Sequence, residues 1–140
     1  MSTSPETVEK QAGRGFKRIV YSQEDIRRRV VEMAREITEA HRPEDNLLVL
    51  GLLKGSFIFM ADLVRRIQLP LEVDFLVVSS YGNSTKTSGD VRLLYDPEAS
   101  LEDRSVILVD DIIDSGTTLK RLVPLLEGRN PRSLDICALL

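Results

Sequence analysis

Four apolar runs of strand length alternate with segments of helical periodicity, and this alternation limits the folds open to the chain. The runs are NLLVLGLL at 46–53, LEVDFLVVSSY at 71–81, SVILVDD at 105–111 and SLDICALL at 133–140. A continuous apolar run is typical of a strand covered on both faces, as in a parallel sheet. Strands that alternate with helices build βαβ units. The pattern therefore predicts an α/β fold, with a mostly parallel sheet flanked by helices.

The first helix is predicted from both its start signal and its periodicity. Ser22 is followed three residues later by Asp25, as in a capping box. Apolar residues then recur at helical spacing through VVEMAREI, and the pattern ends before Pro43.

The remaining elements carry weaker signals. FIFMADLVRRIQ predicts a helix that ends at about Gln68, and SGTTLKRLVPLLEG predicts another. We expect a bend near Val123 in the second of these, because Pro124 lies inside it. RIVYS at 18–22 and VRLLYD at 91–96 are candidates for short strands.

Composition limits the class of protein and its partners. The chain has 140 residues, 42% of them apolar and 29% charged, which is typical of one soluble domain. We expect residues 1–15 to form a disordered tail and residues 16–140 a core domain. The net charge of −3 gives no basic excess, so neither nucleic acid nor an anionic membrane is an expected partner. The single cysteine, Cys137, excludes an internal disulfide and favours a cytoplasmic location.

Three acids follow the third apolar run, in VILVDDIIDSGTTL. Asp110 and Asp111 end the run, and Asp114 comes three residues later. Burying a carboxylate is costly without a partner, and ligands of open parallel sheets bind beyond the carboxyl ends of strands. Neighbouring strand residues point to opposite faces, so the first two acids have different roles. Together they can hold hydrated Mg²⁺ or bind the vicinal hydroxyls of a sugar. The alternative, Asp114 as the N-cap of an ordinary helix, leaves the other two unexplained.

The turn after these acids has the features of a phosphate-binding site. Gly116 allows close backbone approach, and Ser115, Thr117 and Thr118 supply hydroxyl donors. The N–H groups at the start of the following helix add further donors.

Two further segments are candidates for the same site. Lys54 and Gly55, in LLKGS, lie between a strand and a helix and predict a second anion site. A plain connecting turn is the alternative there. The polar segment GNSTKTSGD at 82–90 is either a passive surface loop or a loop that closes over a ligand.

These motifs resemble those of the purine phosphoribosyltransferases of the hypoxanthine-guanine type. VILVDDIIDSGTTL resembles the family's signature for binding phosphoribosyl pyrophosphate (PRPP), and LLKGS resembles its pyrophosphate loop, which often has a cis peptide bond before the lysine. SSYGNSTKTSGDVRLL resembles its mobile catalytic loop. The resemblance covers about residues 16–140, keeps the motif order, and implies a type I phosphoribosyltransferase fold.

The resemblance also implies a role for each motif. Asp114 would exchange a proton at purine N7, and Asp110 with Asp111 would approach the ribose hydroxyls and Mg²⁺. Residues 115–118 would bind the 5′-phosphate. Lys54 and Gly55 would face pyrophosphate. The loop pair Ser80 and Tyr81 would close over the site.

The implied reaction is Mg²⁺-dependent transfer of 5-phosphoribosyl from PRPP to a 6-oxopurine, giving the nucleotide and pyrophosphate. PRPP and a purine base are the implied partners, and we expect a homo-oligomer, a dimer or a tetramer. Two alternatives remain open at this point. One is a pyrimidine-linked phosphoribosyltransferase, and the other is a module that binds PRPP or nucleotide with little turnover.

The family continues past the strand that LDICALL matches. That continuation carries the base-recognition residues, so we expect the 140 residues to lack them. We expect this last strand at a sheet edge, with Ile136, Ala138 and Leu140 poorly covered.

Overall fold

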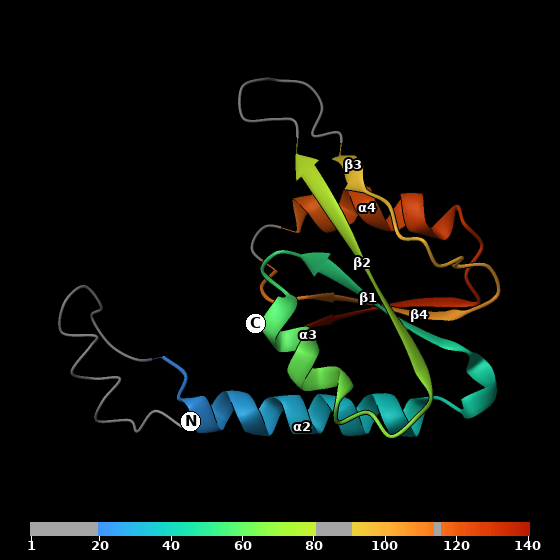
Figure 1. Ribbon diagram of the computed structural model, residues 1–140. Helices are drawn as coiled ribbons and strands as arrows, with labels where there is room; N and C mark the ends of the chain where they lie inside the picture. Colours follow the sequence, from blue (N-terminus) through green and yellow to red (C-terminus); the bar gives the residue numbers. More distant parts are fainter. Residues whose placement is uncertain (1–19, 81–90, 114–115) are drawn as a thin grey trace.

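The computed structural model describes residues 20–80, 91–113 and 116–140, which form one five-stranded sheet with helices (Figure 1). The elements in chain order are α2 (Gln23–Ala40), the short 3-10 helix η1 (Pro43–Asp45), β1 (Leu47–Leu53), α3 (Phe57–Val64), β2 (Leu71–Ser80), β3 (Val91–Tyr95), β4 (Ser105–Asp110), α4 (Thr117–Glu127) and β5 (Ser133–Ala138). The strand order is β3-β2-β1-β4-β5. All pairs are parallel except β2 with β3. The predicted α/β class is confirmed.

Helices cover both faces of the sheet, with α2 and α3 on one side and α4 on the other (Figure 1). Within β1, Leu47 and Val49 pack against α2 and α3, whereas Leu48 and Leu50 pack against α4. All four side chains are at most 1% exposed. Because successive strand side chains point to opposite faces, a strand buried on both sides appears in the sequence as an unbroken apolar run.

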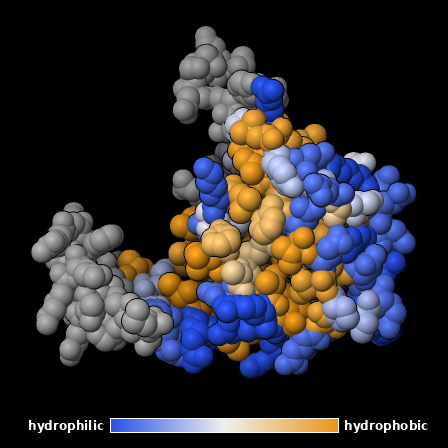
Figure 2. All heavy atoms as spheres, in the orientation of Figure 1, coloured by the Kyte–Doolittle hydropathy of each residue, from blue (hydrophilic) through white to orange (hydrophobic). Residues whose placement is uncertain are grey.

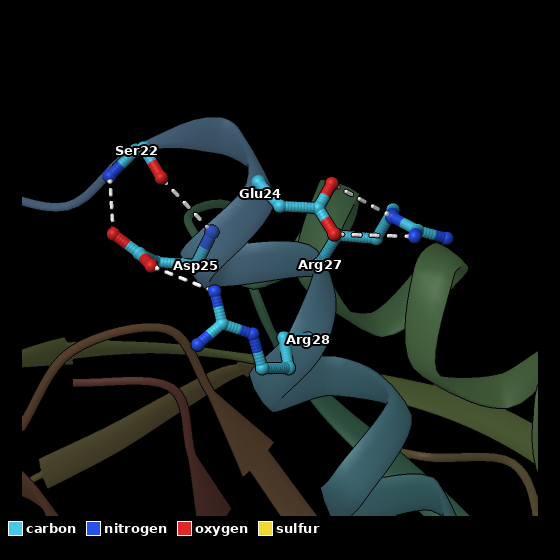
Figure 3. Close-up of polar contacts among 5 residues, drawn as sticks. All are labelled: Ser22, Glu24, Asp25, Arg27 and Arg28. Atoms are coloured by element: carbon cyan, nitrogen blue, oxygen red, sulfur yellow. Dashed lines mark hydrogen bonds and ion pairs between the residues drawn. The ribbon is translucent and has the colours of Figure 1, made fainter.

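The start of α2 has the predicted capping box (Figure 3). The Ser22 hydroxyl accepts a hydrogen bond from the Asp25 N–H at 3.0 Å, and the Asp25 carboxylate accepts one from the Ser22 N–H at 3.1 Å. These bonds hold the pKa of Asp25 below its ordinary value. Arg27 pairs with Glu24 at 3.2 Å, and Arg28 pairs with Asp25 at 3.1 Å. The four charged residues are all exposed, as expected for a charged stripe opposite the core.

Helix α3 is shorter than predicted, and the boundary near Gln68 is wrong. The helix ends at Val64, and the Gln68 N–H donates to the Thr38 hydroxyl of α2 at 3.1 Å instead of to a helical carbonyl. Helix α4 continues through Pro124 without a break. Pro124 and Lys120 are both exposed, so water can replace the hydrogen bond that the proline removes. The expected bend near Val123 stays a prediction.

The last strand lies at the edge of the sheet, as predicted. Among the described residues, β5 pairs only with β4, Ile136 and Leu140 are 44% and 48% exposed, and Ala138 is half-buried. At the other end of the described chain, Val20 and Tyr21 form a bend rather than the short strand considered for RIVYS. Of the helices in the described segments, none is both long and apolar enough to cross a membrane. Residues 1–15, the predicted tail, are outside the described residues.

Candidate active site

Two of the predicted motifs meet at the carboxyl edge of the sheet. β1 and β4 are parallel neighbours, with Gly51 opposite Val109, so the residues that follow both strands emerge side by side. Lys54 and Gly55 follow β1, and Asp111 follows Asp110 at the end of β4. This is the edge at which open parallel sheets bind their ligands.

Gly55 and Asp111 come into direct contact across this edge. A Cβ atom placed on Gly55 would lie 2.9 Å from Oδ2 and 3.0 Å from Oδ1 of Asp111. At such a distance one of the two groups has to shift, so the missing side chain of Gly55 leaves the Asp111 carboxylate room in its present position. The predicted pyrophosphate and ribose motifs are thus packed on each other.

The two acids have different surroundings. Oδ1 of Asp110 accepts the Asp111 N–H at 2.9 Å, and Oδ1 of Asp111 accepts the Ile112 N–H at 2.8 Å. Asp110 borders a small hollow at the start of α4, whereas Asp111 faces Gly55. Burial, assisted by the neighbouring Asp111 carboxyl, raises the pKa of Asp110 above its ordinary value. The separate roles expected from strand alternation fit this arrangement.

The two carboxylates are suitable ligands for a Mg²⁺ ion that is also bound by substrate. Carboxylate oxygens are the ligands that Mg²⁺ takes in proteins, commonly one or two carboxylates completed by water and substrate phosphate. In the described part of the chain, no three His, Cys, Asp or Glu residues are grouped closely enough to form a metal cage. The carboxylates of Asp110 and Asp111 are of the ligand type that Mg²⁺ takes, and substrate and water would have to supply its remaining ligands.

The described part of the predicted phosphate turn, Gly116 to Thr118, forms the start of α4. Gly116 is its N-cap, with φ of 75°, and it has no side chain with which to cap the first helical turn. No acid occupies that turn, so the positive end of the helix dipole is available to an anion. Asp110, Gly116, Thr117 and Thr118 line a hollow of about 120 Å³. Asp114, the N-cap in the alternative interpretation, lies outside the described residues, so that alternative stays open.

Lys54 is exposed, and within the described residues its ammonium group has no hydrogen-bond or ion-pair partner. The Leu53–Lys54 peptide bond is cis, as the resemblance implied. Ser80 is the last residue of β2, which also ends at this edge. Of the other predicted site residues, Tyr81, Asp114 and Ser115 lie outside the described residues, as does the loop at 82–90.

The sequence did not reveal two features that hold the site in place. The N–H groups of Leu139 and Leu140 donate to the Asp111 carbonyl at 3.2 and 3.1 Å, and the Ile113 N–H donates to the Leu140 carbonyl at 3.0 Å. Ser56 is fully buried beneath the Lys54–Gly55 turn. Backbone pairing of this kind has no side-chain signal, and a serine at a helix start normally indicates only a cap.

An apolar surface lies next to the Lys54–Gly55 turn. Figure 2 shows apolar side chains across the middle of one face, over α3 and β2. The exposed large apolar residues on these two elements are Phe57 and Ile58 of α3 and Val73 of β2, which are 57%, 66% and 39% exposed. Apolar surface gathered on one face is typical of a contact with another chain.

Comparison with known proteins identifies the family. The family model of the phosphoribosyl transferase domain matches residues 19–140. The chain is 44% identical over 125 residues to the hypoxanthine-guanine phosphoribosyltransferase of Dictyostelium discoideum, a match that covers 87% of this chain and 69% of that protein. It is also 44% identical over 124 residues to the hypoxanthine phosphoribosyltransferase of Haemophilus influenzae, with the same coverage.

The solved structures agree with the sequence comparison. A crystal structure of a hypoxanthine phosphoribosyltransferase from Staphylococcus aureus superposes with a TM-score of 0.85 at 35% identity, and covers 91% of this chain and 69% of that one. The fold, the carboxyl-edge site and these matches lead to one conclusion: the chain belongs to the hypoxanthine-guanine phosphoribosyltransferases of the type I phosphoribosyltransferase fold.

Proposed function

We propose that the chain transfers a 5-phosphoribosyl group from PRPP to hypoxanthine or guanine, with Mg²⁺, and so forms IMP or GMP and pyrophosphate in purine salvage. The observation that carries the proposal is the meeting of three elements at one sheet edge. These are the Asp110–Asp111 pair, the uncapped start of α4 and the Lys54–Gly55 turn. The relatives with 44% identity are named for this purine activity, which favours it over the pyrimidine-linked alternative.

Each part of the site has one task in this reaction. The start of α4, from Gly116 to Thr118, would bind the 5′-phosphate of PRPP through N–H and hydroxyl donors. Lys54 would pair with the departing pyrophosphate. Asp110 and Asp111 would accept hydrogen bonds from the ribose hydroxyls and hold Mg²⁺, which when bound supplies positive charge beside the leaving group.

The assignment of the proton at purine N7 to Asp114 rests on the family resemblance alone. The same is true of closure by Ser80 and Tyr81. Glycosyl transfer through an oxocarbenium-like centre needs anion sites and exclusion of water rather than a covalent nucleophile.

We further propose that the chain forms a homo-oligomer. The exposed Phe57, Ile58 and Val73 surface supports this, because a surface of that kind is usually covered in solution. Its position next to the Lys54–Gly55 turn would place the contact close to the pyrophosphate subsite. A cytoplasmic location stays a prediction from cysteine content.

A forward assay tests the proposed reaction directly. The full chain is mixed with PRPP, Mg²⁺ and either hypoxanthine or guanine, and nucleotide formation is followed by absorbance. We expect nucleotide with both bases. Orotate or uracil as the accepted base would move the chain to the pyrimidine-linked class.

A second candidate is a module that binds PRPP but turns it over little. The matches span 69% of the length of the relatives. Calorimetric titration with PRPP and Mg²⁺, run beside the forward assay, separates the two. Binding without nucleotide formation supports the module, and binding with turnover supports the transferase.

A further inference from the structure

Ser56 forms an unusual contact for a serine at the start of a helix. It occupies the N-cap position of α3, yet its side chain makes no capping bond to the helix. Its hydroxyl instead donates to the Leu52 carbonyl at 2.6 Å, and the side chain is fully buried. The bond closes the turn that contains Lys54 and Gly55, and a second bond, from the Phe57 N–H to the Lys54 carbonyl at 3.2 Å, reinforces it.

The closed turn lies directly against Asp111. The missing side chain of Gly55 leaves the space that the Asp111 carboxylate occupies, with 2.9 Å between Oδ2 and a Cβ atom placed on the glycine. Asp111 is itself held by the backbone of Leu139 and Leu140. A turn that opened would therefore move Lys54 relative to Asp111, while Asp111 stayed in place.

We propose that Ser56 is a positioning residue that holds the pyrophosphate turn against Asp111 and fixes the distance between the pyrophosphate and ribose subsites. The inference rests on the proposed function and gives a role to Ser56, the last residue of LLKGS, to which the resemblance assigned none. A role in helix capping does not account for Ser56, because the capping bond is absent. A role in filling space alone does not require a hydroxyl at this position.

The proposal predicts a split between two classes of ligand. PRPP and pyrophosphate would contact the Lys54–Gly55 turn, whereas a nucleoside 5′-monophosphate would rely on the start of α4. Loosening the turn should weaken the binding of PRPP and pyrophosphate and leave the binding of the nucleoside 5′-monophosphate unchanged. A general loss of stability would instead weaken the binding of both classes of ligand to a similar degree.

The test measures three affinities on the full chain by calorimetry, for PRPP with Mg²⁺, pyrophosphate with Mg²⁺, and IMP. For Ser56→Ala we expect PRPP and pyrophosphate to bind about five- to tenfold more weakly, as for loss of one buried hydrogen bond, with IMP unchanged. Ser105 is the other buried serine in the described segments, at the opposite end of β4. Ser105→Ala is therefore the matched control, and it should leave all three affinities unchanged.

Ser56→Cys keeps most of the volume with a weaker donor, so it should give a smaller split in the same direction. If Ser56→Ala does not fold, the three affinities of Ser56→Cys provide the test instead. Equal losses for all three ligands, or no loss, would overturn the positioning role while leaving the proposed function intact. A parent chain that binds neither PRPP nor IMP would instead overturn the proposed function, and this inference with it.

Discussion

Replacing Gly116 with valine separates the conformational role of this glycine from its role in anion binding. Gly116 has a φ of 75°, in the left-handed region that side chains disfavour. A Cβ atom placed there meets no atom of the described chain within 4 Å. Among the described residues outside its own helix, the added Cβ atom therefore meets no obstacle, and we expect the branched side chain to hinder the approach of a phosphate.

The expected loss of stability follows from the backbone alone. The left-handed conformation costs an ordinary residue roughly 1–2 kcal/mol. For a chain of this size, each kcal/mol lowers Tm by about 3–5 °C, so Gly116→Val should lower Tm by about 3–10 °C. Gly128, at the other end of α4, has an ordinary φ of −63° and supplies the control. Gly128→Ala should leave Tm nearly unchanged or raise it slightly.

The expected loss of binding is a separate quantity. Each hydrogen bond from a backbone N–H to a charged phosphate is worth about 1.5–3 kcal/mol, so losing one weakens PRPP binding about 10- to 100-fold. Calorimetric titration with PRPP and Mg²⁺ well below Tm measures this loss without a contribution from unfolding. PRPP binding by Gly116→Val that equals that of the parent would refute the phosphate assignment. A loss of PRPP affinity in Gly128→Ala as large as that in Gly116→Val would refute it as well.

Three further experiments test the contact between Gly55 and Asp111, the burial of Asp110 and the burial of Cys137. Gly55→Ala places a Cβ atom 2.9 Å from Asp111 Oδ2, so calorimetry should show weaker binding of PRPP with Mg²⁺ while Tm falls only modestly. Burial raises the pKa of Asp110 above its ordinary value of 3.8, so its charged form destabilises the fold as the pH rises through the folded-state pKa. In metal-free buffer, Asp110→Asn should therefore be more stable than the parent near neutral pH, and urea titration should show this advantage disappear as the pH falls toward 3.8. Burial raises the pKa of Cys137 to about 11, so mass spectrometry should find its alkylation much slower in the native chain than in denaturant.

The sequence predicted those features that depend on local chemistry. β1 and β4 were recognisable because strands buried on both faces carry unbroken apolar runs, and all six residues from Leu47 to Leu52 are buried. The start of α2 was recognisable because Ser22 and Asp25 satisfy each other's backbone within one turn. Asp110 and Asp111 were recognisable because charge at the end of a buried strand needs a partner. Gly116 was recognisable because a glycine among hydroxyl residues at a helix start is typical of a phosphate-binding turn.

The features that the sequence did not predict depend on tertiary contacts. α3 ends at Val64, and beyond it the Gln68 N–H bonds to the hydroxyl of Thr38, thirty residues away in the chain. The fit of Gly55 against Asp111 requires β1 and β4 to be neighbours, and nothing in LLKGS indicates which acid lies opposite. Ser56 was missed because its hydroxyl bonds backward to Leu52 instead of forward to the helix that it precedes.

The dependence of PRPP binding on Mg²⁺ tests the central claim most directly. The full chain and its Asp111→Asn variant are each titrated with PRPP in the calorimeter, once with Mg²⁺ and once with a chelator. The account predicts tight binding by the parent with Mg²⁺, and much weaker binding with the chelator or in the variant. No binding by the parent, or equal binding in all four titrations, would contradict the assignment of Asp110 and Asp111 to the metal and ribose site.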